Sequence, residues 1–239
     1  MKQKIIPSFC VILPMFNEEK GASASIRGIA QFLRGVEART AIIAVDDGSR
    51  DRTLAVLNAL KGELPSLIVA AHEKNQGYGA ANRTAFAVAV KEGFEYALVM
   101  DADGTQSPQY IERFFEPMRA AVDFIKATRY ARGGSVTGVR FRRWVISWAG
   151  NKLARLVLRL PITDYTNGFR AIRIPILKRL RCKESGFAML IEEVVQAKKL
   201  GATFAEVPYR LTARAKEASA SKFVYSGKIY LGYLRNLFN

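Results

Sequence analysis

Short apolar runs alternate with helical patterns along the first half of the chain. Four of these runs have the length and composition of buried strands: residues 9–13, 41–45, 67–71 and 96–100; residues 123–127, in the second half, are a candidate for a further strand. After the first run, Ile26, Ile29, Ala30 and Leu33 follow the i, i+3, i+4, i+7 spacing of a helix that buries one face. Further helical patterns cover residues 53–60 and 79–92. Because strands and helices alternate, the pattern predicts an α/β fold with a mostly parallel sheet flanked by helices.

The second half is less regular, and its clearest pattern is an amphipathic helix over residues 142–159. One face is apolar, a neighbouring face is basic, and Trp144 and Trp148 lie one turn apart. Residues 223–239 repeat the amphipathic spacing beside further basic residues. A basic edge with tryptophans suits a helix lying at a membrane interface. A surface helix packed on the sheet would give the same pattern, so both interpretations stay open.

Polar residues gather where the predicted strands end. The clusters are Asn17-Glu18, Asp46-Asp47, Asn75-Gln76-Gly77 and Asp101-Ala102-Asp103. Ligands of open α/β sheets bind outside the carboxyl ends of the strands, so we expect these clusters to share one crevice. Two carboxylates one residue apart form a hard-oxygen site suited to Mg²⁺ or Mn²⁺, the ions that accompany diphosphates. The chain is therefore expected to handle a phosphorylated small molecule.

The basic residues are unevenly distributed along the 239-residue chain, whose formal charge is +16. Residues 1–128 hold 15 basic and 15 acidic residues, whereas residues 129–239 hold 22 basic and 6 acidic ones. The excess indicates an anionic partner for the second half: a nucleic acid, an acidic membrane surface or a phosphorylated substrate. A basic surface that is merely solvated is the alternative.

No segment supplies the ~20 consecutive apolar residues of a membrane-spanning helix. Pro7, Pro14 and Asn17 interrupt the apolar stretch that a signal peptide needs near the N-terminus. We therefore expect a cytoplasmic or peripheral protein.

Two other enzyme classes use parts of the same pattern. An apolar run followed by Asp101-Ala102-Asp103-Gly104-Thr105 also fits the nucleophile motif of haloacid-dehalogenase-type phosphatases. In that family the motif usually opens the chain and another acidic pair follows it, whereas here the motif lies mid-chain and the other acidic pair precedes it. A Rossmann dehydrogenase is disfavoured because no G-x-G-x-x-G joins a strand to a helix.

The order of the motifs resembles one family across nearly the whole chain. The segments that carry the resemblance are residues 11–19, 45–53, 75–77, 101–103, 128–130, 143–147, 164–170, 206–208 and 214–222. Together they are similar to family 2 glycosyltransferases of the GT-A fold, in the branch of dolichyl-phosphate mannose synthases and polyprenyl-phosphate glycosyltransferases. The resemblance implies a GT-A catalytic domain over residues 1–222 and an amphipathic tail over residues 223–239. Within the domain, residues 1–128 would bind the nucleotide sugar and residues 129–222 the acceptor.

The resemblance also implies roles for individual residues. The donor would contact Pro14, Phe16, Asn17, Glu18, Asp46, Asp47, Asn75, Gly77, Asp101, Ala102, Asp103 and Gln106. Asp101 and Asp103 would hold Mg²⁺ or Mn²⁺ on the donor diphosphate, and together with Arg129 they form the expected catalytic set. The acceptor phosphate would be bound by Arg129, Arg143, Ser147, Arg170, Arg214 and Lys222. This chain departs from its relatives in the position of Gln106. The glutamine follows Asp103 by three residues here, whereas in many relatives it follows the second aspartate by two.

The function implied is an inverting, metal-dependent transfer of a hexose from a nucleotide sugar, of the GDP-mannose or UDP-glucose type, to a polyprenyl or dolichyl phosphate. A family 2 enzyme with a soluble or polysaccharide acceptor, and a non-catalytic basic module that binds membranes or nucleic acid, are the alternatives. The leading function implies that the protein binds an anionic membrane surface and does not bind nucleic acid. It also implies a location on the cytoplasmic face of a membrane. Many relatives continue into transmembrane helices. This chain is therefore expected to be a peripheral enzyme, to use a membrane-anchoring partner, or to belong to a longer protein whose tail enters the bilayer.

Overall fold

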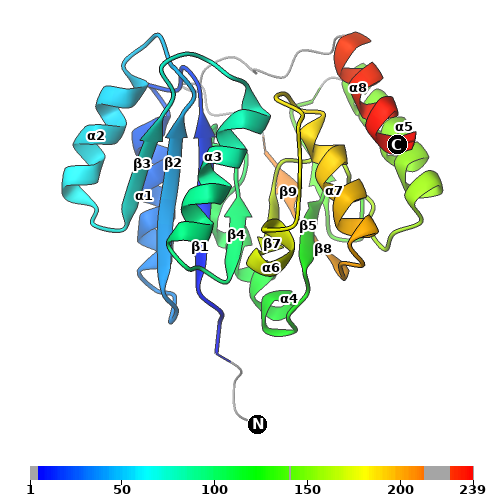
Figure 1. The fold of residues 1–239 in the computed structure, drawn as a ribbon, viewed down its shortest axis with the longest axis horizontal. Helices are drawn as coiled ribbons and strands as arrows, with labels where there is room; N and C mark the ends of the chain where they lie inside the picture. The colour runs from blue at the N-terminus through cyan, green and yellow to red at the C-terminus, as the bar shows by residue number, and fades with distance from the viewer. Residues whose placement is uncertain (1–4, 140, 213–226, 239) are drawn as a thin grey trace.

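A computed structural model describes residues 5–139, 141–212 and 227–238, without the side chains of residues 143 and 228–230. Within these ranges, one seven-stranded sheet has the order β3-β2-β1-β4-β7-β5-β8 (Figure 1). Its strands are β1 (Phe9–Met15), β2 (Thr40–Asp46), β3 (Leu67–Ala71), β4 (Tyr96–Val99), β5 (Phe124–Thr128), β7 (Arg170–Arg173) and β8 (Phe204–Pro208). Strand β7 runs antiparallel to β4 and β5, and the other pairs in this sheet are parallel. The predicted mostly parallel sheet is thus confirmed.

Helices cover both faces of the sheet (Figure 1). One face packs against α1 (Ala22–Leu33), α2 (Thr53–Glu63), the 3₁₀ helix η1 (Pro108–Phe114) and α4 (Phe115–Arg119). The other face packs against α3 (Tyr78–Lys91), α5 (Phe141–Leu158), α6 (Ile174–Leu177) and α7 (Met189–Lys199). In β1, Phe9 and Val11 join the first cluster and Cys10 and Ile12 the second, because successive strand side chains point to opposite faces. The core therefore has two layers with the sheet between them.

Each strand and helix predicted from the apolar pattern is present at nearly the expected position. The pattern did not predict β7 or β8, because Arg170 and Glu206 interrupt their short apolar runs. A separate two-stranded sheet, formed by β6 (Ser135–Val136) and β9 (Arg210–Leu211), was also not expected.

Helices α5 and α8 (Gly227–Phe238) contact each other at one edge of the molecule (Figure 1). In and just before these helices, large apolar side chains are exposed: Val139, Phe141, Val145, Trp148, Leu153, Leu156, Leu231, Leu234 and Phe238. The two helices expected in the second half are therefore present, and both expose apolar side chains. Among the described residues, no helix has the length and apolarity that crossing a bilayer demands.

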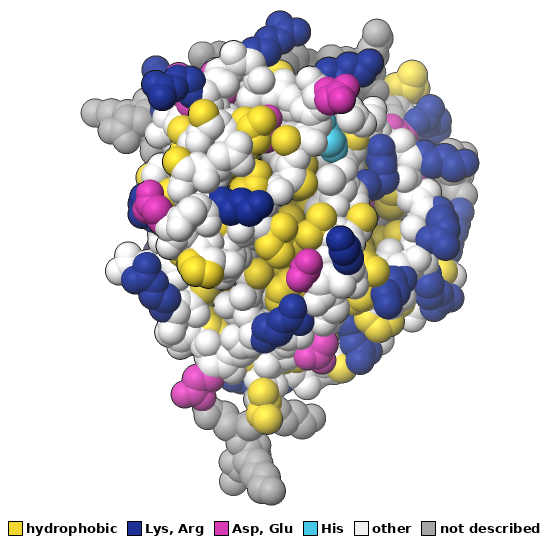
Figure 2. Space-filling view, turned by 60° about the vertical axis from the view of Figure 1, so that its left-hand side comes forward, with side chains coloured by type: hydrophobic (Ala, Val, Ile, Leu, Met, Phe, Trp, Pro, Cys, Tyr) yellow, Lys and Arg dark blue, Asp and Glu magenta, His cyan; other side chains and the backbone are white. Residues whose placement is uncertain are grey.

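The basic excess of the second half lies on the surface. Exposed basic residues there are Arg132, Arg142, Lys152, Arg155, Arg159, Lys178, Arg179, Arg181, Lys183, Lys198, Lys199, Arg210 and Arg235. On the face drawn in Figure 2, Lys and Arg side chains gather along the right-hand edge, whereas acidic side chains are scattered. The charge asymmetry of the sequence thus becomes an uneven surface charge.

Candidate active site

The turn after β4 fixes the aspartate pair at the carboxyl end of the sheet. Gln106 holds Asp101 in two ways: its amide nitrogen donates to Asp101 Oδ2 at 2.7 Å, and its side-chain carbonyl accepts the Asp101 N–H at 3.0 Å. Asp103 Oδ1 accepts the N–H of Thr105 at 3.0 Å and its hydroxyl at 2.6 Å. Both carboxylates therefore have defined orientations. Gln106, which the resemblance assigned to the donor, is buried and supports Asp101 in this structure.

Asp47 orders the loop between β3 and α3. Its Oδ1 lies 2.7 Å from His72 Nδ1, and its Oδ2 accepts from Asn75 Nδ2 at 2.9 Å. They also accept the N–H of Gln76 at 3.0 Å and of Gly77 at 2.8 Å. Four partners take up the acceptor positions of one carboxylate. In this structure the carboxylate of Asp47 therefore holds the loop after β3, and its contact with the donor stays a prediction.

Gly77 joins this loop to the start of α3 at a point where no side chain fits. Its φ is 98°, and a Cβ there would lie 2.4 Å from the carbonyl oxygen of Ser185. Glycine adopts such a φ without the steric penalty of other residues. Gly77 thus lets the loop pass close to the backbone of Ser185.

Asp46, the last residue of β2, and Glu18, in the turn after β1, each have a buried carboxylate oxygen. Asp46 is 2% exposed, and its Oδ2 accepts the N–H of Ser49 at 3.2 Å. Within the described part of the chain, Asp46 Oδ1 and Glu18 Oε2 have no hydrogen-bond partner. Such buried acceptors cost free energy until a ligand or water donates to them. Each of these carboxylates therefore has one buried oxygen to which no group of the described residues donates.

The remaining residues of the expected donor set lie at the ends of β1 and β4. Pro14 pairs with Val45 of β2 near the end of β1, and Phe16 follows directly. Asn17 has φ 52°, and its Oδ1 accepts the N–H of Arg50 at 2.8 Å, so it links the turns after β1 and β2. Ala102 is buried between the two aspartates. The structure therefore brings the donor set together at one edge of the sheet.

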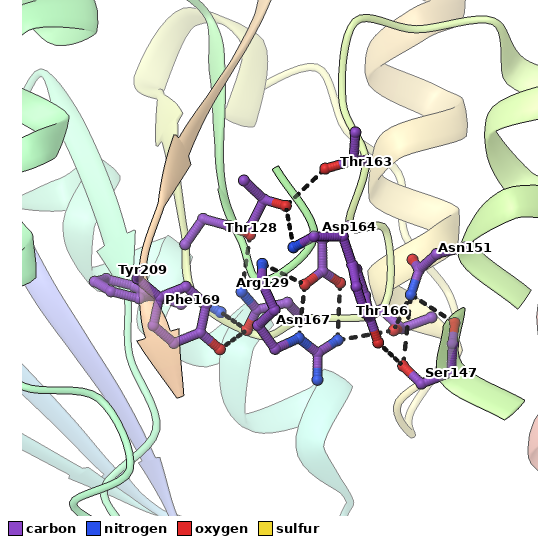
Figure 3. A network of polar contacts seen from close by, with 12 residues as sticks. Thr128, Arg129, Ser147, Asn151, Thr163, Asp164, Thr166, Asn167, Phe169 and Tyr209 are labelled. Atoms are coloured by element: carbon purple, nitrogen blue, oxygen red, sulfur yellow. Dashed lines mark hydrogen bonds and ion pairs between the residues drawn. The ribbon is translucent and has the colours of Figure 1, made fainter. Parts of the chain in front are cut away.

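Arg129, directly after β5, is held by Asp164 (Figure 3). Its Nε and Nη2 donate to the two carboxylate oxygens at 2.7 and 2.8 Å, and its backbone N–H donates to the same carboxylate at 3.2 Å. Burial opposes the charge of Arg129, but Asp164 more than offsets this and holds the pKa of the guanidinium above its usual value. A bidentate pair also fixes the plane of the guanidinium. Arg129 is thus a rigid, permanent cation.

Ser147 belongs to the same polar network (Figure 3). Its Oγ accepts the hydroxyl of Tyr130 at 2.9 Å, and its carbonyl accepts Asn151 Nδ2 at 2.8 Å. Asn151 also donates to Thr166 Oγ1 at 3.2 Å. Ser147 therefore ties helix α5 to the turn that carries Arg129.

Arg170 does not have the position expected of a phosphate ligand. Its side chain is fully buried and pairs with Glu193, whose Oε1 accepts Nη2 at 2.7 Å. Nε donates to the other oxygen of Glu193, and the remaining donors reach Tyr78, Asn82 and the carbonyl of Gly168. All five N–H donors of the guanidinium are thus occupied. The predicted grip on an acceptor phosphate is corrected to a structural role.

Three residues of the expected acceptor set are not placed. Arg214 and Lys222 lie outside the described residues, and so does the side chain of Arg143.

A cavity of about 720 Å³ connects the polar turns to the apolar edge of the molecule. Asp101, Asp103, Arg129 and Ser147 line its polar part. Apolar side chains from β6, α5, α7 and α8 line the rest, among them Val136, Trp144, Leu153, Leu190, Leu234 and Leu237. The cavity is therefore suited to a molecule with an anionic end and an apolar body.

Sequence reasoning missed Lys126, which lies beneath the site in β5. It is fully buried and donates to the carbonyl of Asn167, a residue that lines the cavity. Burial, together with the positive charge of Arg170, lowers the pKa of Lys126 to about 7. A lysine within an otherwise apolar strand was the signal available in the sequence.

The aspartate pair matches the donor set of a divalent ion that works on diphosphates. Among the described residues, no three His, Cys, Asp or Glu side chains gather into a metal site. Mg²⁺ at such sites usually takes one or two carboxylates from the protein, while substrate phosphates and water supply the other ligands. Asp101 and Asp103 fit this arrangement.

Solved structures share the fold. The chain aligns over 97% of its length with glucosyl-3-phosphoglycerate synthase from Mycobacterium tuberculosis in complex with Mn²⁺, UDP and glucosyl-3-phosphoglycerate. The TM-score is 0.71, the identity is 20%, and 79% of that chain is covered. The same synthase in complex with Mg²⁺ and UDP aligns with a TM-score of 0.71 at 20% identity, over 97% of this chain and 78% of that one. The architecture is therefore that of the GT-A glycosyltransferases, as expected.

Residues 10–181 match Glycosyl transferase family 2, so the chain belongs to this family and is a glycosyltransferase. Polyprenol monophosphomannose synthase of Mycolicibacterium smegmatis is 30% identical over 208 residues, which cover 85% of this chain and 77% of that protein. Undecaprenyl-phosphate mannosyltransferase of Micrococcus luteus is 29% identical, with 85% and 83% covered. Dolichol-phosphate mannosyltransferase of Pyrococcus furiosus is 29% identical over 95% of this chain, which spans 62% of that protein.

Proposed function

We propose that the protein transfers a hexose, with inversion, from a nucleotide sugar of the GDP-mannose or UDP-glucose type to a polyprenyl phosphate. The observation that carries this proposal is the cavity, in which Asp101, Asp103 and Arg129 adjoin an apolar channel. A prenyl phosphate has the matching shape, an anionic head on an apolar chain. A soluble sugar acceptor would have no use for the apolar lining. The polyprenyl-phosphate mannosyltransferases among the relatives support the same acceptor class.

The acceptor would bind as an anion, which decides what the site must supply. The second pKa of a phosphate monoester is ~6, so the attacking oxygen already carries negative charge at neutral pH. No strong general base is then needed. Arg129, fixed by Asp164, would attract the phosphate and align it with the anomeric carbon for in-line displacement.

On the donor side, Asp46 and Glu18 would accept hydrogen bonds from the base or ribose. Asp101 and Asp103 would hold Mg²⁺ or Mn²⁺ on the diphosphate. There the ion would neutralise the charge that develops on the leaving nucleoside diphosphate.

An acceptor comparison tests this function. Purified protein with Mn²⁺ is given GDP-mannose or UDP-glucose together with undecaprenyl phosphate, undecaprenol or a soluble oligosaccharide. We expect the protein to transfer the hexose to undecaprenyl phosphate. In Arg129→Gln the rate of this transfer should fall by about 10²-fold or more, since the change removes the cation from the site. Arg27→Gln is the matched control, because Arg27 is half exposed and pairs with Glu63 on the surface. Transfer to the oligosaccharide without transfer to undecaprenyl phosphate would contradict the proposal.

The proposal includes peripheral docking on an anionic membrane surface, on the cytoplasmic face. The apolar side chains exposed by α5 and α8 lie beside the basic residues Arg142, Arg155 and Arg159. Lys152 Nζ lies 5.5 Å from the ring centroid of Trp148. Such a face suits the boundary between lipid headgroups and acyl chains. Because the cavity is lined by the same two helices, docking would bring its mouth to the lipid acceptor. A membrane-anchoring partner would be an additional means of attachment.

Leu156→Glu is expected to weaken binding to vesicles that contain phosphatidylglycerol by about 10-fold. The side chain is 71% exposed on α5, and the change removes an apolar contact worth about 1.5–3 kcal/mol. Co-sedimentation with vesicles measures the effect. Ile5→Glu makes a comparable change at a residue that is 85% exposed and precedes β1 by four residues. The chain enters β1 at the end of the molecule away from α5 and α8 (Figure 1). Equal losses in both variants would argue against a docking face on these helices.

A further inference from the structure

Thr105 holds the second aspartate of the pair with two donors. Its hydroxyl donates to Asp103 Oδ1 at 2.6 Å, and its N–H donates to the same oxygen at 3.0 Å. Hydroxyl contacts of about 2.5–2.7 Å are typical of donation to an ionised carboxylate, and they are stronger than contacts between neutral groups. Thr105 and Asp103 are each 8% exposed, so little water can replace a lost donor. One residue therefore fixes the orientation of this carboxylate.

The backbone of the turn lets Thr105 reach back to Asp103. Gly104, which separates the two residues, has a φ of 72°, in the left-handed region that glycine adopts at little cost. Gln106, the next residue along the chain, holds Asp101 through the two contacts described above. Two consecutive residues of the turn therefore orient the two aspartates, one each.

The carbonyl of Thr105 attaches the same turn to the two-stranded sheet. It accepts the N–H and the hydroxyl of Thr212, both at 3.3 Å. Thr212 directly follows β9, and β9 pairs with β6. Both strands contribute to the wall of the cavity, through Val136 and Leu211. The turn that carries the aspartates is therefore joined to the cavity wall through Thr105.

We propose, on the basis of the metal-binding role proposed above for Asp103, that Thr105 is a positioning residue for the metal site. Its hydroxyl and N–H hold the carboxylate of Asp103 in the orientation that binds the ion. Its carbonyl ties the aspartate turn to the strand β9, so that the turn keeps its place in the cavity. Loss of a hydrogen bond to a carboxylate that binds a metal typically lowers the affinity for the metal by about 10–100-fold.

Thr105→Val tests this role, because valine has nearly the shape of threonine and lacks the hydroxyl. Mn²⁺ is titrated into the protein, alone and with UDP or GDP, and free Mn²⁺ is measured by electron paramagnetic resonance. We expect the Kd for Mn²⁺ to rise about 10-fold. Thr105→Ser keeps the hydroxyl but loses a buried methyl group. It should lower the melting temperature and leave the Kd for Mn²⁺ close to that of the wild type, whereas a purely structural role would make the Kd follow the melting temperature.

Thr203→Val is the matched control, because Thr203 makes the same pair of contacts with another aspartate. Its N–H and its hydroxyl donate to Asp123 Oδ2, both at 3.0 Å. Asp123 precedes β5 and Thr203 precedes β8, at the end of the sheet opposite to the site. The control should leave the Kd for Mn²⁺ unchanged. An equal rise of the Kd in Thr105→Val and Thr105→Ser would overturn the role of the hydroxyl.

Asp103→Asn distinguishes a failure at Thr105 from a failure of the metal site. We expect this variant to lose Mn²⁺ binding. If it does so while Thr105→Val binds Mn²⁺ as the wild type does, the positioning role of Thr105 is overturned and the metal site stands. If Asp103→Asn itself binds Mn²⁺ as the wild type does, the metal role of Asp103 fails, and the role of Thr105 falls with it.

Discussion

Asp101→Asn is expected to lower kcat for hexose transfer by about 10³-fold or more. The change keeps the size of the side chain and its contact with Gln106, but it removes the negative charge that the proposed ion requires. The measurement is the initial rate of transfer to undecaprenyl phosphate at saturating Mn²⁺, together with the melting temperature. We expect the melting temperature to stay close to that of the wild type, because the side chain is only partly buried.

Asp123→Asn is the matched control for this prediction. Asp123 precedes β5 at the opposite end of the sheet, where it accepts the N–H of Thr203 at 3.0 Å. Its replacement should leave the transfer rate unchanged. Full activity in Asp101→Asn would show that the aspartate pair has no part in the chemistry.

Glu193→Gln is expected to lower the free energy of unfolding by about 3–5 kcal/mol, the largest stability effect that we anticipate for a single change. Arg170 and Glu193 are both fully buried, so removal of the carboxylate charge leaves the guanidinium without its counter-ion in the core. Urea denaturation measures the loss.

Glu63→Gln separates this effect from the loss of an ordinary ion pair. Glu63 pairs with Arg27 on the surface, where the two side chains are 52% and 50% exposed. Exposed pairs contribute about 0–1 kcal/mol, so the control should hardly change the urea midpoint. Similar midpoints for the two variants would mean that the buried pair does not stabilise the sheet as we argue.

The strands and the aspartate pair were predictable from the sequence because their signals are local. β1 and β4 are continuous apolar runs, and an acidic turn directly after such a run places its carboxylates at the end of a buried strand. Their convergence followed from the topology rule for parallel strands. The order of the motifs carried the family resemblance, and the resemblance implied the GT-A fold.

The roles of Arg170 and Asp47 were not predictable, because they depend on partners distant in sequence. Arg170 meets Glu193 from α7 and Tyr78 from α3, and nothing in the residues around it indicates full burial. The four partners of Asp47 come from residues 72–77, in a loop whose path no periodicity describes. A motif therefore identified these residues as important without revealing whether they contact a ligand or hold the fold.

The insertion of β7 between β4 and β5 has a consequence for synthesis on the ribosome. The gap in the middle of the sheet cannot close until residue 173 has left the exit tunnel, although β4 and β5 emerge much earlier. Until then both strands have an unpaired edge, and such edges are templates for aggregation. Protection of the nascent chain by a chaperone would therefore matter most after residue 128 has left the tunnel and before residue 173 has done so. Fragments cut between residues 128 and 129 should fail to fold separately, since neither has a complete sheet.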